Sequence, residues 1–376
     1  MGAVTTSNLK PFDAVVLMSF GGPEKPEEVV PFLQNVTRGR GIPDERLEEV
    51  GEHYFSFGGR SPINEQNRAL KSALEAAFEA RGIDAALLWG NRNWAPFLSD
   101  VLRAQAAEGA RSFLAIDTSA YSSYSSCRQY REDFGAVTAQ LAEEGISVEI
   151  DKIRQYYNHP GFAAAELDAV RQALADFTAQ VGEIDPAQHR LLYVTHSIPT
   201  AMQRASEART AGYRGQHQQL IDWIAEQLGQ ELILESELVY CSRSGPPQVP
   251  WLEPDVNDRM EELKEDGVTG VILVPIGFVS DHMEVKFDLD TEAKETAERL
   301  GMAFTRAATV GTHEAFVSGL VDLVEERAAQ RRGESVEAPA VTPEGALQPG
   351  TGACSIDCCL GMKDRPVLPQ WESAAG

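Results

Sequence analysis

Two short apolar runs of the sequence each lead to a side chain that can take part in acid–base or metal chemistry. The run 191–195 ends directly at His196, and the run 271–275 leads through a loop to Glu284. Ligands of open α/β sheets gather at the carboxyl ends of the strands, so both side chains are candidates for a site. His196 is our first catalytic candidate because histidine titrates nearest to neutral pH. The alternative is that it only caps a loop or satisfies a buried carbonyl group.

Three carboxylates follow one another at a regular spacing: Glu284, Asp288 and Glu292. On an α-helix, residues four apart rotate by only about 40° around the axis and therefore share one face. Like charges at this spacing repel each other, which favours a path for a divalent cation with oxygen and imidazole ligands. The alternative is an ordinary solvated helix face with Lys286 and Lys294 nearby.

Arginines and aromatic residues gather in two stretches near the start of the chain. Arg38 and Arg40 flank a glycine, and residues 54–62 read Tyr-Phe-Ser-Phe-Gly-Gly-Arg-Ser-Pro, which we expect to form a loop. Arginine binds carboxylates through two parallel hydrogen bonds, and aromatic rings can cover a flat apolar ligand. Both stretches are therefore candidate walls of a pocket. The alternative is a pair of solvated arginines beside a small satellite of the core.

Cysteines cluster towards the end of the sequence. The chain has five of them: Cys127, Cys241, Cys354, Cys358 and Cys359. The last three form a Cys-x3-Cys-Cys pattern in a stretch rich in Gly and Pro. Because a cytosolic chain keeps its thiols reduced, this pattern favours metal or iron–sulfur ligation over disulfides.

Composition narrows the class of protein. The chain has 376 residues, which suits two domains, and its 43% hydrophobic and 24% charged residues are typical of a soluble globular protein. No apolar run is long enough to span a membrane, and residues 1–10 do not resemble a secretory signal, so we expect a cytoplasmic protein. The net charge of -24 argues against nucleic-acid binding. An anionic ligand would need local arginines to override this charge.

Strands and helices are expected to alternate along the chain. The expected strands are 14–18, 85–89, 111–116, 191–195, 237–241, 271–275 and 302–307, and the expected helices are those from about 26, at 95–107, from about 127, and at 162–180, 216–228, 256–265 and 314–330. This alternation predicts the α/β class with parallel, doubly wound sheets, the second beginning in the later half of the chain. The tail from Arg331 to Gly376 reads as a linker that only its cysteines could hold down.

Several stretches of the sequence, in the same order, resemble blocks of the ferrochelatase family, and specifically of the actinobacterial coproporphyrin III ferrochelatases. The resemblance covers about residues 12–328, and the stretches are 13–24, 91–94, 195–199, 242–251 and 275–284. It implies two similar Rossmann-like domains with a porphyrin in the cleft between them. The first would span 12–157 and be joined by the last helix, 312–330, the second would span 158–311, and 331–376 would be a linker and a cluster-binding tail.

The resemblance implies that the protein is an enzyme that inserts ferrous iron into a porphyrin in haem biosynthesis. We expect coproporphyrin III as the substrate, with Fe-coproporphyrin III (coprohaem) and two protons as the products. His196 and Glu284 match the family's paired histidine and glutamate, which serve as transient iron ligands or as acceptors of the pyrrole protons. Asp288 and Glu292 match an acidic row that leads outward from the glutamate on a helix with a wide π-type turn.

Other activities stay open beside this one. Protoporphyrin IX is the alternative substrate, although the chain has no apolar membrane-docking lip near its first domain. A cobalt chelatase is less favoured because related cobalt enzymes generally have histidine at the position of Glu284. A non-catalytic iron–sulfur or haem sensor is the alternative from another class, because a fold does not guarantee an activity. The retained His196, Glu284 and acidic row argue against the sensor.

The resemblance also implies a set of porphyrin contacts on both walls of the cleft. They are Phe20, Arg38, Arg40, Tyr54, Ser61, Ser123, Tyr124 and Trp251. The arginines would collect the carboxylates of an anionic porphyrin on an otherwise acidic protein. Phe20 departs from the pattern, since some relatives have a tyrosine there that can ligate product iron, and a phenyl ring cannot bind iron.

A subset of the family carries a [2Fe-2S] cluster, which needs four thiolates. The resemblance implies that Cys127, Cys354, Cys358 and Cys359 are the ligands, whereas Cys241 is expected to be a core residue. Because inserting ferrous iron is not a redox step, the cluster would serve stability or sensing. The implied partners are the porphyrin, ferrous iron and, transiently, neighbouring haem-pathway enzymes, with no nucleic acid and no integral membrane segment. We expect a monomer.

Overall fold

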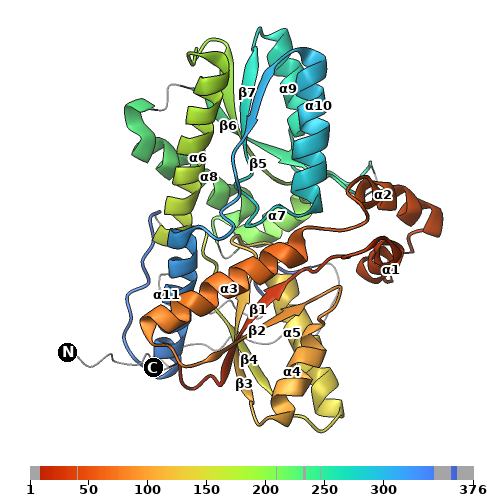
Figure 1. Ribbon diagram of the computed structural model, residues 1–376, viewed down its shortest axis with the longest axis vertical. Coiled ribbons are helices and arrows are strands. Elements are labelled where there is room, and N and C mark those ends of the chain that lie inside the picture. Colours follow the sequence, from red (N-terminus) through yellow and green to blue (C-terminus); the bar gives the residue numbers. More distant parts are fainter. Residues whose placement is uncertain are drawn as a thin grey trace.

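The structure is a computed structural model, and it describes residues 9–39, 41–208, 210–231, 234–245, 247–342 and 357–361. In these residues the strands form two parallel sheets of four strands each. Figure 1 shows one sheet above the other, with helices on both faces of each. The predicted α/β, doubly wound fold class is therefore confirmed.

The two sheets have the same topology. Their orders are β2-β1-β3-β4 and β6-β5-β7-β8, so the earliest strand of each sheet lies between the second and the third. The strands of the first sheet are β1 (Ala14–Ser19), β2 (Ala86–Asn91), β3 (Ser112–Asp117) and β4 (Glu149–Lys152). Those of the second are β5 (His189–His196), β6 (Ser236–Cys241), β7 (Gly270–Val274) and β8 (Ala303–Arg306).

Helices connect the strands and cover the sheets. Those of the first half are α1 (Pro26–Val36), α2 (Asp44–Ser56), α3 (Ile63–Arg81), α4 (Leu98–Ala107), the π-helix η1 (Tyr124–Arg128) and α5 (Gln129–Glu143). Those of the second half are α6 (Pro160–Val181), α7 (Thr200–Glu207), α8 (Gly212–Leu228), the short 3-10 helix η2 (Gly229–Glu231), α9 (Val256–Glu265), the π-helix η3 (Val285–Ala293) and α10 (Lys294–Leu300). The last described helix is α11 (Glu314–Arg331).

Central strands bury both of their faces. Every residue of β1 is buried, and alternate residues point to opposite sides of the sheet. Val15 belongs to a core shared with α3, α6, α8 and α11, and Tyr193 of β5 belongs to the same core. Val16 packs with α4 and α5, and Val194 packs with α9, η3 and α10. One continuous core therefore joins the two halves, and each sheet has a second core on its other face.

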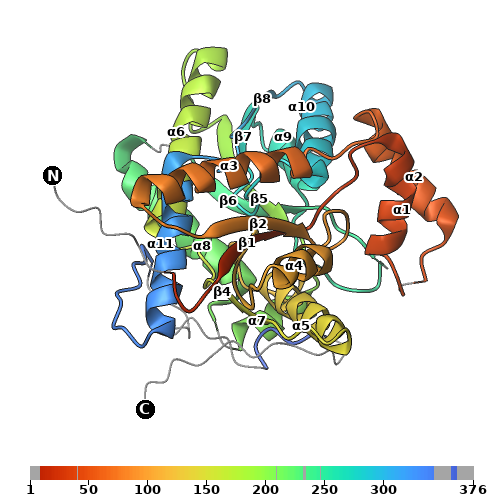
Figure 2. The ribbon, with the colours of Figure 1, turned by 60° about the horizontal axis from the view of Figure 1, so that its bottom comes forward.

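Three helices connect or flank the two halves. Helix α11 packs against α3 of the first half and α6 of the second. Helices α1 and α2 form a pair that lies to one side of both sheets, as Figures 1 and 2 show. Phe32 of α1 anchors this pair in a small separate core. None of the helices in the described part of the chain is long and apolar enough to cross a membrane.

The structure corrects several expected elements. The stretch 54–62 is not a loop throughout, because α2 continues to Ser56 and the turn begins only at Phe57, before Gly58 and Gly59 with φ of 75° and 73°. The Tyr54 ring packs on Phe32 from within α2, which ends two residues before Gly58. Helices α2, α3, α7 and α10 and strand β4 were not predicted.

Candidate functional site

His196 is the last residue of β5, and its ring has a defined orientation. The Nδ1 atom lies 2.5 Å from the carbonyl oxygen of Ser197. Because a carbonyl only accepts hydrogen bonds, Nδ1 carries the proton in the neutral ring, and the lone pair is then on Nε2. The Tyr213 hydroxyl donates to the carbonyl of His196 over 3.1 Å and fixes the main chain behind the ring. The free lone pair on Nε2 is available to a metal ion or a proton.

Glu284 lies opposite this lone pair. Its Oε1 atom is 3.6 Å from Nε2 of His196, and its Oε2 atom is 3.4 Å from Nδ1 of His282. Burial lowers the pKa of His282, and the neighbouring Glu284 only partly opposes this. A carboxylate between two imidazoles offers nitrogen and oxygen donors of the kind that first-row divalent metals accept. Sequence reasoning missed His282, although it lies in the same stretch as Glu284.

The two predicted strand ends therefore converge. His196 ends β5, and Glu284 immediately precedes η3, which the loop after β7 reaches. Because β5 and β7 are hydrogen-bonded parallel neighbours, their carboxyl ends meet at one edge of the second sheet. The wide π-type turn that the resemblance implied is present in η3. In the described residues, no group of three or more His, Cys, Asp or Glu side chains is arranged to hold a metal ion.

Asp288 is the second member of the acidic row, and its pKa lies well above the usual value for an aspartate. Burial, with smaller contributions from Glu284 and Glu292, raises the pKa of Asp288 to about 7. The hydroxyl of Ser242 donates a close hydrogen bond to Oδ2 of Asp288 and opposes this rise. Ser242 reaches the carboxylate from a backbone with φ of 61°, a conformation that costs energy outside glycine. A carboxyl group that titrates near neutral pH can both take up and release protons.

Glu292 continues the row on the exposed side of η3. Burial raises its pKa, and the nearby Asp255 and Glu295 raise it further. Lys286 does not neutralise this row, because its Nζ atom pairs with Asp290 at 2.8 Å on the same helix. The alternative of a solvated helix face with Lys286 nearby therefore does not describe the row, because the charge of Lys286 is directed to Asp290.

The first half supplies aromatic residues that approach the same region. Phe20 follows β1, is 38% exposed, and packs edge-on against Phe32 at 6.3 Å. The Arg92 guanidinium lies over the Phe20 ring, 5.8 Å from its centre. Burial raises the pKa of Tyr54, and the charge of Glu284 raises it further, so this side chain lies near the acidic site. Phe20 and Tyr54 thus share one aromatic group with Phe32.

Helix α2 also contacts the π-helix directly. The rings of His53 and Phe287 stack with centroids 3.7 Å apart and planes at 10°. His53 belongs to α2 in the first half, whereas Phe287 belongs to η3 beside the acidic row. This stack is therefore a direct contact between the first and second halves beside the site.

The remaining predicted porphyrin contacts lie in different surroundings. Ser61 is buried and precedes α3, and Arg38 is exposed after α1, whereas Arg40 lies outside the described residues. The Trp251 Nε1 atom is buried without a hydrogen-bond partner in the described residues. A buried donor of this kind is available to a ligand.

Two other predicted contacts make hydrogen bonds close to their own position in the chain. Ser123 is fully buried, and its hydroxyl oxygen accepts a hydrogen bond from the main chain of Ser126. Tyr124 donates its hydroxyl proton to Glu132 over 3.2 Å. Whether either residue contacts a porphyrin stays a prediction.

Three of the predicted cluster ligands lie together. Cys127, Cys358 and Cys359 form a buried group, with 3.6 Å between the sulfurs of the last two. A hydrogen bond from the Cys359 thiol lowers the pKa of Cys127 and raises that of Cys359. Cys354, the fourth predicted ligand, lies outside the described residues. Cys241 is buried in the core of the second sheet, as expected.

The sequence is similar to known proteins over most of its length. The ferrochelatase family matches residues 12–328. The coproporphyrin III ferrochelatase of Streptomyces griseus subsp. griseus is 50% identical over 365 residues, which cover 95% of this chain and 96% of that protein. Its counterpart from Streptomyces coelicolor is 48% identical with the same coverage. The solved structure of SirB from Bacillus subtilis with Fe3+ is 14% identical, has a TM-score of 0.46, and covers 85% of this chain and 97% of that chain.

Proposed function

The chain belongs to the ferrochelatase family, and on that premise we propose that it inserts ferrous iron into coproporphyrin III, giving Fe-coproporphyrin III in haem biosynthesis. The similarity to relatives named coproporphyrin III ferrochelatase, over 95% of this chain, supports the substrate. In the reaction two pyrrole N–H bonds break, the iron binds the four ring nitrogens, and two protons leave. No electron is transferred, so the protein must supply bases and transient ligands rather than a redox group.

The observation that carries this proposal is the pair formed by His196 and Glu284. The neutral imidazole presents the lone pair of Nε2, and the carboxylate of Glu284 lies 3.6 Å away. Together they can replace water around an incoming Fe2+ ion and accept the pyrrole protons as the metal–nitrogen bonds form. His282 would orient the Glu284 carboxylate from its other oxygen.

Protons leave the site, in this proposal, along the acidic row. Glu284 would pass a proton to Asp288, whose pKa of about 7 allows it to accept and release protons near neutral pH. Glu292, one further step along η3, is exposed and would release the proton to solvent. The same row can carry a divalent cation inward, because its charges are not cancelled by Lys286.

Porphyrin binding is proposed to involve both halves. Phe20 and Tyr54 would lie against the ring, and the arginines at 38 and 40 would pair with propionates. Ser61, Ser123 and Tyr124 would add hydrogen bonds, as would the Nε1 atom of Trp251, which has no partner among the described residues. Since Phe20 has no group that binds iron, the product would have no protein ligand from this position.

The division into domains stays our proposal, with 12–157 and 158–311 as the domains and 312–330 joining the first. It is supported because each sheet lies within one of these ranges and because α11 packs on α3. The cytoplasmic location, the monomeric state and transient contact with neighbouring haem-pathway enzymes stay predictions.

We also propose that the tail binds a [2Fe-2S] cluster. The three described thiols fit such a group because they are buried together and because the hydrogen bond from Cys359 lowers the pKa of Cys127. Cys127, Cys358, Cys359 and Cys354 would hold it. When bound, the cluster would supply a cross-link between the tail and the first half that is sensitive to oxidants.

The experiment that tests the activity is anaerobic turnover with Fe2+, in which loss of free-base porphyrin fluorescence is followed with coproporphyrin III and protoporphyrin IX in parallel. We expect a higher kcat/KM with coproporphyrin III. Preference for protoporphyrin IX would keep the reaction and overturn the substrate. If protein with its cluster intact inserts iron into neither porphyrin, the proposed enzymatic activity would be overturned and a non-catalytic sensor favoured.

A further inference from the structure

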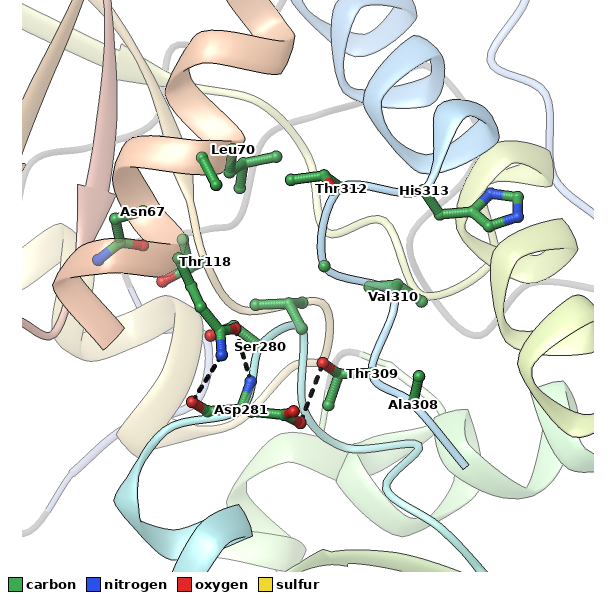
Figure 3. A pocket seen from close by; sticks show the side chains of 14 residues that line it. Asn67, Leu70, Thr118, Ser280, Asp281, Ala308, Thr309, Val310, Thr312 and His313 are labelled. Atoms are coloured by element: carbon green, nitrogen blue, oxygen red, sulfur yellow. Dashed lines mark hydrogen bonds between the residues drawn. The ribbon is translucent and has the colours of Figure 1, made fainter. Parts of the chain in front are cut away.

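A pocket of about 480 Å³ lies behind the loop that carries the site. It is lined by α3, by the loop after β7 and by the loop after β8, so residues far apart in the chain meet there. Figure 3 shows Asp281 at one side of this pocket, with Thr309 beside it and dashed hydrogen bonds that converge on Asp281. The loop after β7, which contains Asp281, continues to His282 and Glu284.

The main chain of Asp281 is held by one side chain from the other half of the protein. The amide of Gln66, on α3, donates through Nε2 to the carbonyl oxygen of Asp281 over 2.9 Å. In return, the backbone N–H of Asp281 donates to Oε1 of Gln66 over 2.8 Å. The two bonds close a ring between one side-chain amide and one residue's peptide groups, as a neighbouring β-strand would.

The side chain of Asp281 is held from the opposite direction. Arg306 donates through Nη1 to its Oδ1 atom over 3.0 Å, and the hydroxyl of Thr309 donates to the same oxygen over 3.2 Å. Arg306 also binds both carboxylate oxygens of Asp290 on η3, at 2.7 and 2.8 Å. Asp281 is therefore fixed from the second half by its carboxylate and from the first half by its peptide groups.

We propose that Gln66 is a positioning residue for metal insertion, an inference that rests on the proposed function. Asp281 precedes His282 directly and Glu284 by three residues, so its peptide sets where the Glu284 carboxylate lies. Helix α3 begins two residues after Ser61, a proposed porphyrin contact. Gln66 thus fixes the position of the Glu284 carboxylate in the second half relative to the porphyrin-binding segment at Ser61 in the first half.

The test compares Gln66→Met, which has a similar volume and no hydrogen bonds, with the wild type and with Gln172→Met. Gln172 is an exposed residue of α6 and bonds only within its own helix, to Asp176, in the described residues. For Gln66→Met we expect kcat with Fe2+ and coproporphyrin III to fall by about 10- to 100-fold, with KM for the porphyrin unchanged. Deuterium uptake should become faster in the peptide 279–284. Gln172→Met should behave as the wild type in both measurements.

The proposal would be overturned if folded Gln66→Met kept the kcat of the wild type. It would also be overturned if kcat/KM fell only because KM for the porphyrin rose. If Gln66→Met does not fold, Gln66→Glu keeps the size and the acceptor oxygen but loses the donor to Asp281. A smaller fall in kcat is then expected, and unchanged kcat overturns the proposal. A wild-type protein that inserts no iron would instead overturn the proposed function, and deuterium uptake would still decide whether Gln66 holds the loop.

Discussion

Replacement of Ser242 by alanine is predicted to move the acid limb of the activity to higher pH. The Ser242 hydroxyl donates to Asp288, whose pKa of about 7 already reflects burial and the neighbouring carboxylates. Asp288 accepts protons only when ionised, so kcat should fall as the pH drops below its pKa. Losing the hydrogen bond removes a contact that stabilises the ionised form, and the pKa should rise further.

The size of this shift follows from the strength of the bond. A hydrogen bond to a charged group contributes about 1.5 to 3 kcal/mol, and one pKa unit corresponds to about 1.36 kcal/mol. The loss of the bond alone would therefore raise the pKa of Asp288 by about one to two units. Because water can partly replace the hydroxyl at this half-buried position, we expect a shift of about one unit.

The assay is kcat for anaerobic iron insertion across the range from about pH 5 to 9. Ser244→Ala is the matched control, since Ser244 lies in the same loop and is exposed. The wild type and the control should lose activity below about pH 7, and Ser242→Ala below about pH 8. An acid limb of Ser242→Ala at or below that of the wild type would refute the reasoning. So would an unchanged limb in Asp288→Asn.

Two further predictions concern the tail and the network behind the site. Cys127→Ser should lose the visible absorption of the iron–sulfur cluster and lower Tm while keeping the kcat of the folded protein, and retained absorption would contradict the ligand assignment. Arg306→Met should lower the free energy of unfolding by about 2 to 3 kcal/mol in urea, because it leaves Asp281 and Asp290 without their main cation at partly exposed positions. Burial raises the pKa of Asp290, but the hydrogen bonds of Arg306 and Lys286 outweigh it and lower the pKa, so this loss should be full at neutral pH and shrink below about pH 4. An unchanged urea midpoint would contradict the role of Arg306.

The sequence predicted the sheets and the central pair because buried parallel strands carry a simple signal. The runs before His196 and Glu284 are apolar without alternation, as expected where helices cover both faces of a sheet. The carboxyl ends of such strands meet at one edge, so the two side chains could be placed in one region without coordinates.

Elements that depend on paired charges were harder to predict. Strand β4 contains Asp151 and Lys152, which a pattern based on hydrophobicity assigns to the surface. Both are buried, because Arg327 pairs with Asp151 at 2.8 Å and Asp117 pairs with Lys152 at 3.3 Å. These partners are far away in the sequence, so no local pattern announces them.

The residues that support the site could not be predicted from the sequence either. Gln66 lies on α3, which the predicted elements omit although its Ala, Leu and Glu residues favour a helix. Nothing in its sequence neighbourhood indicates that its amide bonds to Asp281, which follows in the chain only after 215 residues. His282 carried a stronger signal, since it lies two positions before Glu284.

The most direct test of the account is a single-turnover measurement of iron insertion into coproporphyrin III by the wild type, His196→Ala and Glu284→Gln under anaerobic conditions, with porphyrin binding measured separately. If this pair replaces water around the iron and accepts the pyrrole protons, each substitution should slow insertion by about 10²- to 10⁴-fold while the porphyrin still binds. Insertion at the wild-type rate by either variant, with the porphyrin bound, would contradict the central role of the His196–Glu284 pair.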